Sequence, residues 1–173
     1  DDEIIAALIG SANTGKTGST SVALPAAQKI AHGSTGLTIA KLVEAKQKLD
    51  EKSVDPSITR YIVCSPKQIS DLLGTTQVTS SDFNTVKALA NGEINSFLGF
   101  NFITSNRLSI ASSKRLCLAY AGDGIKLALG QDIMTRIDER SAKGYATQVY
   151  VCMTMGATRM EEEKVVQIDC DES

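Results

Sequence analysis

One stretch of the sequence has the residue types and spacing of a phosphate-binding loop. Residues 10–17 read G-x-x-x-x-G-K-T, with Gly10 and Gly15 framing the loop and Lys16 and Thr17 where a P-loop places its lysine and hydroxyl. In a P-loop a buried strand leads in and a helix leads out, so that backbone amides and the helix N-terminus face the phosphates. The apolar residues 4–9 could serve as the strand. The motif therefore raises the hypothesis of a nucleotide-binding protein.

The residues after the motif argue against nucleotide binding. Residues 18–21, Gly-Ser-Thr-Ser, are poor helix formers, and Pro25 would lie inside the required helix. One acidic residue, Asp169, follows an apolar strand-like run and could help to hold magnesium, but too little sequence follows it to complete a parallel sheet. We therefore interpret residues 10–17 as a Gly/Ser/Thr loop with one lysine, and keep the P-loop protein as an alternative.

Other candidates for catalysis or metal binding are weaker. The sequence has one histidine, His32, in a loop-like stretch, and its four cysteines form no CxxC pair, which disfavours a catalytic triad and a structural zinc site. Cys64 and Cys152 lie in strand-like apolar runs, where a cysteine usually acts as a small buried hydrophobe. The glutamates at 161–163 are typical of a solvated segment. We expect no catalytic residue, no metal and no cofactor, and hence a protein that is not an enzyme.

The composition is that of an ordinary globular protein. The 173 residues suit one domain or two small ones, with 42% hydrophobic and 22% charged residues. The net charge of −2 argues against a strong nucleic-acid-binding footprint. No apolar run approaches the roughly 20 residues of a membrane span, so we expect no membrane partner. The cysteines, without a secretion signal, favour folding in a reducing cytoplasm.

A four-turn helix is the clearest secondary-structure element. Apolar residues recur at helical spacing between about residue 38 and residue 52. We expect this helix to pack on a sheet from the C-terminal third of the chain through Leu42, Val43 and Leu49. Lys41 is expected on the wetter side of the helix.

The other elements alternate irregularly between helix and strand. Residues 11–20 read as a flexible loop, and the residues around Pro25 as an extended edge segment. The further helices are expected at residues 1–9, 66–73 and 83–90, and the strands at residues 60–64, 94–97, 100–104, 116–121, 133–137, 146–155 and 164–168. No strict βαβ repeat is present, so the fold class is α+β.

Several segments, in this order along the chain, resemble one protein family. They are residues 37–46 (LTIAKLVEAK), 60–68 (RYIVCSPKQ), 92–102 (GEINSFLGFNF), 130–140 (GQDIMTRIDER) and 156–166 (GATRMEEEKVV). The first three resemble parts of the major capsid proteins of tailed bacteriophages. The first is similar to the spine helix, the second to the strand and helix that enter the axial domain, and the third to the strand–Gly–strand crossing. The last two resemble prophage capsid proteins. Herpesvirus capsids and encapsulins share this fold.

The resemblance implies a two-domain architecture. A peripheral domain, with a long spine helix on a β-sheet, would comprise residues 1–60 and 141–173. An axial domain, a mixed sheet flanked by short helices, would comprise residues 61–140. The family's N-terminal arm and extended hairpin would be largely absent, because only about 36 residues precede the spine-like segment. Residues before 60 would share a sheet and a core with residues after 144, including the strand at 146–155, while the middle of the chain protrudes.

The resemblance also implies a function in a virus particle. The chain would be a structural subunit of an icosahedral phage head, forming pentamers and hexamers that enclose DNA without sequence-specific binding. Its partners would be copies of itself, with a scaffolding protein and a portal, and it would reside in the virion capsid after assembly in the host cytoplasm. The alternating charges of Arg136, Asp138, Glu139 and Arg140 are our candidate subunit contact. An encapsulin-like compartment shell stays an alternative with the same fold.

Overall fold

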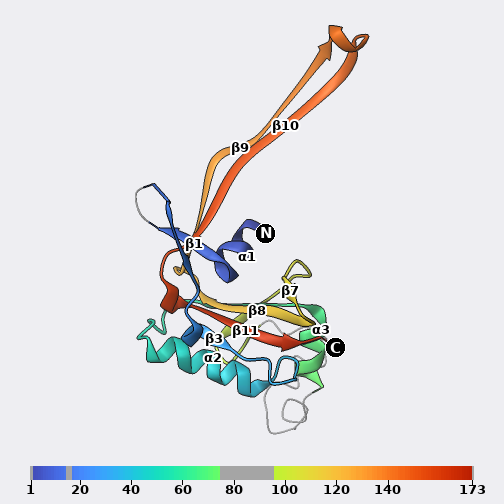
Figure 1. The fold of residues 1–173 in the computed structure, drawn as a ribbon. Helices are drawn as coiled ribbons and strands as arrows, with labels where there is room; N and C mark the ends of the chain where they lie inside the picture. The colour runs from blue at the N-terminus through green and yellow to red at the C-terminus, as the bar shows by residue number, and fades with distance from the viewer. Residues whose placement is uncertain (1, 15–16, 75–95, 173) are drawn as a thin grey trace.

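The body of the protein is built on one mixed sheet of seven strands (Figure 1). The computed structural model describes residues 2–14, 17–74 and 96–172. The strands run in the order β3-β11-β8-β4-β6-β5, with β7 paired to β8. Their bounds are β3 (Lys29–Ile30), β4 (Arg60–Cys64), β5 (Ser96–Phe97), β6 (Phe100–Thr104), β7 (Ile110–Ala111), β8 (Lys114–Ala121) and β11 (Val165–Asp171). The β3–β11 and β4–β6 pairs are parallel and the others antiparallel, as the α+β class predicts.

Helices cover both faces of this sheet. Helix α1 (Asp2–Ile9) contacts β8, and α2 (Ile39–Glu51) packs against β11 on the opposite side (Figure 1). Burial on both faces explains why β8 has consecutive buried apolar residues rather than an alternating pattern. In β8 the buried residues include Cys117, Leu118 and Ala119, which are consecutive. The core therefore lies at β8 and β11, between the helices.

The predicted four-turn helix is confirmed as α2, and two details of its faces are wrong. Thr38 caps its N-terminus by accepting a hydrogen bond from the Lys41 amide (3.4 Å). Leu42 and Leu49 are fully buried, as expected, but Val43 is 48% exposed. Successive helical residues are about 100° apart, so Val43 turns away from the sheet. Lys41, expected on the wetter side, is buried.

Lys41 is buried because backbone carbonyls replace water around its ammonium group. Its Nζ lies within hydrogen-bonding distance of the carbonyl oxygens of His32 (2.8 Å), Thr35 (2.8 Å), Gly36 (2.9 Å) and Asp169 (3.0 Å). Burial lowers the pKa of Lys41 below its ordinary value. The side chain thus joins α2, the loop that precedes it and strand β11.

Most of the shorter elements lie where the sequence predicts them. The structure confirms the helices predicted at residues 1–9 and 66–73, which are α1 and α3 (Pro66–Leu73). It also confirms the predicted strands that correspond to β4, β5, β6, β8 and β11. The flexible loop predicted at residues 11–20 is wrong, because β1 (Ser11–Thr14) pairs with β2 (Thr20–Ala23) in a hairpin. The segment around Pro25 forms a 3-10 turn and the edge strand β3. The helix predicted at residues 83–90 lies outside the described residues.

The three cysteines nearest the core behave as apolar side chains. Cys64, Cys117 and Cys170 are buried and free. Burial raises the pKa of the Cys64 thiol to about 12, so it stays protonated at neutral pH. Cys152, also expected to be buried, is only half-buried.

The C-terminal third departs most from the sequence-based expectation. Strands β9 (Ile125–Arg140) and β10 (Ala146–Arg159) form a separate antiparallel hairpin that extends away from the body (Figure 1). The core expected between residues 146–155 and the spine-like helix is therefore wrong, since α2 packs on β11 instead. The β3–β11 pair does unite residues before 60 with residues after 144, as predicted. That sheet also contains β4, β6 and β8, and the division into two domains stays a prediction.

A carboxylate after β11 joins three parts of the body. Glu172 forms a two-point contact with Arg115 of β8, at 2.9 Å from Nε and 2.8 Å from Nη2. The Ser65 hydroxyl, expected to cap α3, instead donates to the same carboxylate (3.0 Å). The hydrogen bonds from Arg115 hold the pKa of Glu172 below its usual value.

The Glu172 contact predicts a loss of stability in acid. The folded-state pKa of Glu172 is depressed, so its contribution to the free energy of unfolding is fully present above the unfolded pKa of about 4.5. That contribution is lost as the pH falls through the lower folded-state pKa. We expect Glu172→Gln to lower the free energy of unfolding by about 1–2 kcal/mol at pH 7, with a gap to wild type that narrows below pH 4. Urea unfolding between pH 3 and pH 7 measures this gap. A gap independent of pH would contradict the assignment, and Glu44→Gln, on the exposed side of α2, serves as the control.

Candidate subunit-contact surface

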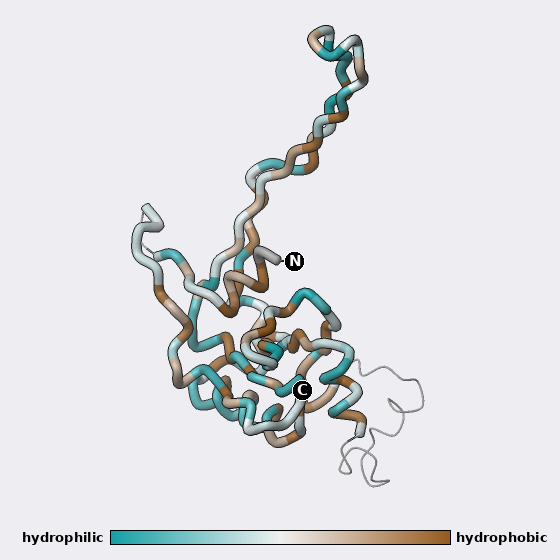
Figure 2. Tube along the Cα trace, turned by 45° about the vertical axis from the view of Figure 1, so that its right-hand side comes forward, coloured by the Kyte–Doolittle hydropathy of each residue, from teal (hydrophilic) through white to brown (hydrophobic). Residues whose placement is uncertain are grey.

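The β9–β10 hairpin exposes a long surface that the body does not cover. Sixteen residues of β9 span about 50 Å at roughly 3.3 Å per residue. The turn joining the strands includes Gly144 and Tyr145 in left-handed conformations, with φ of 63° and 60°. Figure 2 shows apolar and polar residues interspersed along this projecting ribbon. A two-stranded ribbon presents two faces and two unpaired edges, so all four are open to a partner.

The pairing register gathers apolar side chains on one face of the outer half of the hairpin. Ile137 lies opposite Val149, and Thr135 lies opposite Val151. Residues two apart in a strand share a face, so these four side chains adjoin one another. Ile137, Val149 and Val151 are 67%, 61% and 59% exposed. They form an apolar strip, here called the apolar face, that no described part of the chain covers.

The opposite face of the same segment carries charge. Arg136, Asp138 and Arg140 alternate with the apolar residues and therefore point to the other side. Glu139, which we grouped with them from the sequence, lies opposite Thr147 and shares the apolar face. The four charges thus do not form one strip, because strand alternation separates Glu139 from its neighbours.

None of the four charged residues forms an ion pair within the described part of the chain. Arg136 and Asp138 instead line a shallow open groove together with Met134, Gln148 and Tyr150. Charges that are solvated in a single chain remain available to a partner of complementary charge.

A buried arginine fixes the base of the hairpin to the body. Arg159, at the end of β10, has no exposed side-chain surface. Its Nη1 donates to the carbonyl oxygens of Ala7 (3.2 Å), Leu8 (3.2 Å) and Gly10 (3.1 Å), and its Nη2 donates to that of Val22 (3.1 Å). The last carbonyls of a helix lack partners within the helix, and Arg159 supplies them for α1. The same side chain ties β2 to the hairpin.

Sequence reasoning missed Arg159, and no local pattern reveals it. The carbonyls that it binds lie 137 to 152 residues away along the chain. The local sequence around an arginine near a strand end does not distinguish a solvent-exposed side chain from one that is buried against a helix C-terminus.

The P-loop-like motif has the wrong elements around it. Helix α1 precedes it and strand β2 follows it, the reverse of the strand–loop–helix order that phosphate binding requires. Gly10 closes α1 instead: its amide donates to the Ala6 carbonyl (2.8 Å), and a Cβ on Gly10 would lie 2.6 Å from that oxygen. The Thr17 hydroxyl donates to Ser19 Oγ (3.0 Å). Gly15 and Lys16 lie outside the described residues.

We expect no nucleotide binding by this motif. Titration calorimetry with ATP and magnesium should give no saturable heat, because no helix N-terminus follows the loop. Lys16→Ala should behave as the wild type does. Micromolar binding that Lys16→Ala abolishes would contradict this expectation.

Neither a membrane-spanning helix nor a metal-binding cluster is present in the described residues. No helix there is long and apolar enough to cross a membrane. The same residues contain no group of three or more His, Cys, Asp or Glu side chains placed to hold a metal ion.

Solved capsid structures share this fold at low sequence identity. The capsid of Ralstonia phage GP4 matches 99% of this chain and 63% of its own, with a TM-score of 0.71 and 13% identity. The head structure of Helicobacter pylori bacteriophage KHP40 matches 100% of this chain and 65% of its own, with a TM-score of 0.67 and 12% identity. The SrpI encapsulin of Synechococcus elongatus PCC 7942 matches 97% of this chain and 60% of its own, with a TM-score of 0.60 and 12% identity.

These matches confirm the fold that the resemblance predicted. The chain spans less than two thirds of the length of these solved relatives. No curated protein matches the sequence. The family model described as phage capsid protein matches residues 1–172, and the chain therefore belongs to the phage capsid protein family.

Proposed function

We propose that this chain is the shell-forming part of a structural subunit of a phage head, and that its β9–β10 hairpin is a contact surface for other copies. Family membership supports the structural role. The observation that carries the contact surface is the apolar face of the outer hairpin, with Ile137, Val149 and Val151 exposed at the end of a ribbon about 50 Å long. An apolar surface of this kind on a projecting element is typical of an interaction site.

The two faces of the hairpin would contribute differently to assembly. Burying an aliphatic side chain stabilises a contact by about 1.5–3 kcal/mol, so Ile137 and Val149 would supply most of the affinity. The alternating charges of Arg136, Asp138 and Arg140 would select a neighbour of complementary charge and fix its register. Identical subunits joined through unlike surfaces form closed rings when the rotation between them closes, which is the geometry of pentamers and hexamers.

The finer parts of the proposal follow from the family and the charge. The shell would enclose DNA without sequence-specific contacts, consistent with a net charge of −2, and would act without catalysis. A scaffolding protein and a portal would be further partners during assembly in the host cytoplasm, and the virion capsid would be the final location. The family match favours a phage head over an encapsulin-like compartment.

The double substitution Ile137→Glu/Val149→Glu tests the contact surface. Both side chains are exposed in the single chain, so the fold should be preserved, and thermal unfolding checks this. We expect self-association, measured by sedimentation velocity over a range of concentrations, to weaken at least a hundredfold, because two apolar contacts are replaced by buried like charges.

Val43→Glu is the matched control, since Val43 is an exposed apolar residue on α2, away from the hairpin. This control should associate as the wild type does. A wild-type chain that stays monomeric at every concentration, or a double variant that associates normally, would contradict the proposal.

A further inference from the structure

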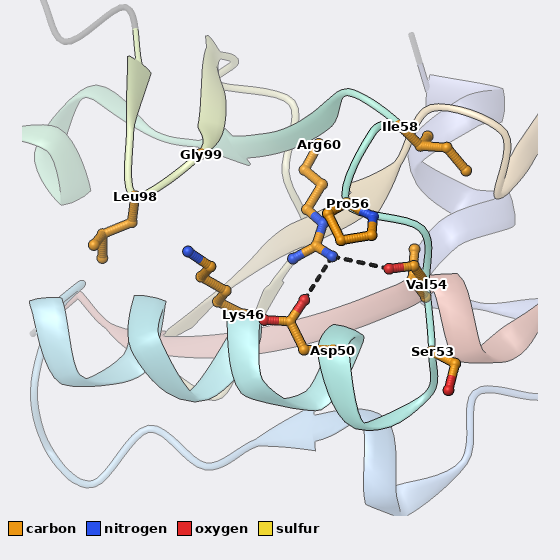
Figure 3. Close-up of a pocket in the computed structure, with 9 residues that line it drawn as sticks. All are labelled: Lys46, Asp50, Ser53, Val54, Pro56, Ile58, Arg60, Leu98 and Gly99. Carbon is orange, nitrogen blue, oxygen red and sulfur yellow. Dashed lines mark hydrogen bonds and ion pairs between the residues drawn. The ribbon is translucent and has the colours of Figure 1, made fainter.

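An open pocket of about 530 Å³ lies on the body (Figure 3). It is distant from the outer half of the hairpin, as Figure 1 shows for the elements that line it. Its walls are the second half of α2, the connection from α2 to β4, and the turn between β5 and β6. Three charged side chains line it, Lys46, Asp50 and Arg60. Aliphatic residues, including Val54 and Leu98, line the remaining wall.

Arg60 is buried in this wall, and some of its hydrogen-bond donors have no acceptor among the described residues. The residue is only 6% exposed. Its Nη2 donates to Asp50 Oδ1 (2.6 Å) and to the Val54 carbonyl (3.2 Å). Its Nε has no partner among the described residues, although a guanidinium group has five N–H donors. Nε is itself enclosed by the protein, so it cannot reach a ligand. Nη1 also forms no hydrogen bond to the described residues and is not among the enclosed atoms, so it is the donor that an acceptor in the pocket could use.

Lys46 adds a second cation to the same space. Figure 3 shows the Lys46 and Arg60 side chains turned toward the same open side, between α2 and the β5–β6 turn. The described residues give the Lys46 ammonium group no hydrogen bond or ion pair, and Asp50 is already engaged by Arg60. Two cations and one carboxylate leave a charge of +1 in the pocket.

We propose that this pocket binds a carboxylate group carried on a short apolar stem. The carboxylate would accept hydrogen bonds from Arg60 and Lys46, while the stem would lie against Val54 and Leu98. A single negative charge balances the +1 of the pocket, whereas a phosphate dianion would leave an excess negative charge beside Asp50. The carboxylate can come from a free organic acid or from an acidic side chain of a second copy, and the experiment separates these sources. The proposal does not depend on the phage-head role.

Saturation-transfer NMR with butyrate as the probe tests the proposal, since it reports weak binding to a slowly tumbling protein, whether single or assembled. Butylamine, which has the same stem and the opposite charge, is the reference ligand. We expect saturable transfer to butyrate and none to butylamine. Lys46→Met should weaken butyrate binding about fivefold to tenfold, while Lys143→Met, which removes the same charge at the hairpin turn, should leave it unchanged. Lys46 is exposed on α2, so its substitution should not disturb folding.

Sedimentation velocity with butyrate or with equal sodium chloride identifies the source of the carboxylate. If butyrate and Lys46→Met both reduce self-association, the natural occupant is an acidic side chain of a second copy; if neither does, it is a free acid. The proposal is overturned by equal transfer to butyrate and butylamine, or by unchanged butyrate binding in Lys46→Met. It is also overturned if inorganic phosphate displaces half of the butyrate at a lower concentration than the one at which butyrate half-saturates the pocket.

Discussion

Replacing Arg159 with methionine is expected to lower the free energy of unfolding by about 3 kcal/mol or more. Methionine keeps much of the buried stem but removes the donors that serve the carbonyls of Ala7, Leu8, Gly10 and Val22. Each buried acceptor left without a donor costs about 1–3 kcal/mol, and water reaching some of them reduces the total. Urea unfolding at neutral pH gives the change.

Hydrogen exchange should show where the Arg159→Met variant loosens. Amides of α1 and of the β1–β2 hairpin should exchange with lower opening energies, whereas those of β8 and β11 should follow global unfolding. Arg136→Met is the matched control, because Arg136 is exposed on the outer hairpin, and its substitution should change stability by less than about 0.5 kcal/mol. Wild-type stability in Arg159→Met would mean that the four carbonyls are satisfied in another way.

Leu42→Ala is expected to cost about 2–5 kcal/mol, the range for removing a leucine side chain from a packed core. Leu42 is fully buried on the face of α2 that packs against the sheet. The loss combines the transfer energy of the removed carbons with the cavity that they leave. Urea unfolding measures the loss, and hydrogen exchange should show α2 and β11 opening together as one unit.

The neighbouring residue supplies the control for Leu42→Ala. Val43 is 48% exposed, so Val43→Ala should change stability by less than about 0.5 kcal/mol. Equal effects of the two substitutions would show that the buried face of α2 has been assigned incorrectly.

Local patterns predicted the elements that are stabilised by local interactions. The helical spacing around Leu42 and Leu49, and the run of residues 60–64, are confirmed in α2 and β4. The glycine between Leu98 and Phe100 marked a tight connection, and both Leu98 and Gly99 have left-handed conformations, with φ of 52° and 85°. Such signals arise from neighbours in sequence, so they can be read without knowledge of the fold.

Long-range contacts account for what the sequence did not reveal. Lys41, Arg60 and Arg159 are buried because carbonyl or carboxylate oxygens surround them, some of them more than a hundred residues away along the chain. Their residue type alone predicts exposure, which is why Lys41 was placed on the wetter side of its helix.

The hairpin shows a second limit of sequence reasoning. An alternating pattern such as that around Ile137 predicts a strand with one apolar face, but it does not say what covers that face. The pattern of residues 146–155 therefore predicts a place in the core of the body, whereas among the described strands β10 pairs only with β9.

The attachment of the hairpin at Arg159 has a mechanical consequence. A ribbon about 50 Å long acts as a lever, so a tilt of roughly 5° at its base moves its tip by about 4 Å. That displacement nearly equals the spacing of about 4.8 Å between neighbouring strands, which is enough to put a contact at the tip out of register. The stiffness of a few hydrogen bonds at the base would thus set the positional tolerance at the far end, where one copy meets the next.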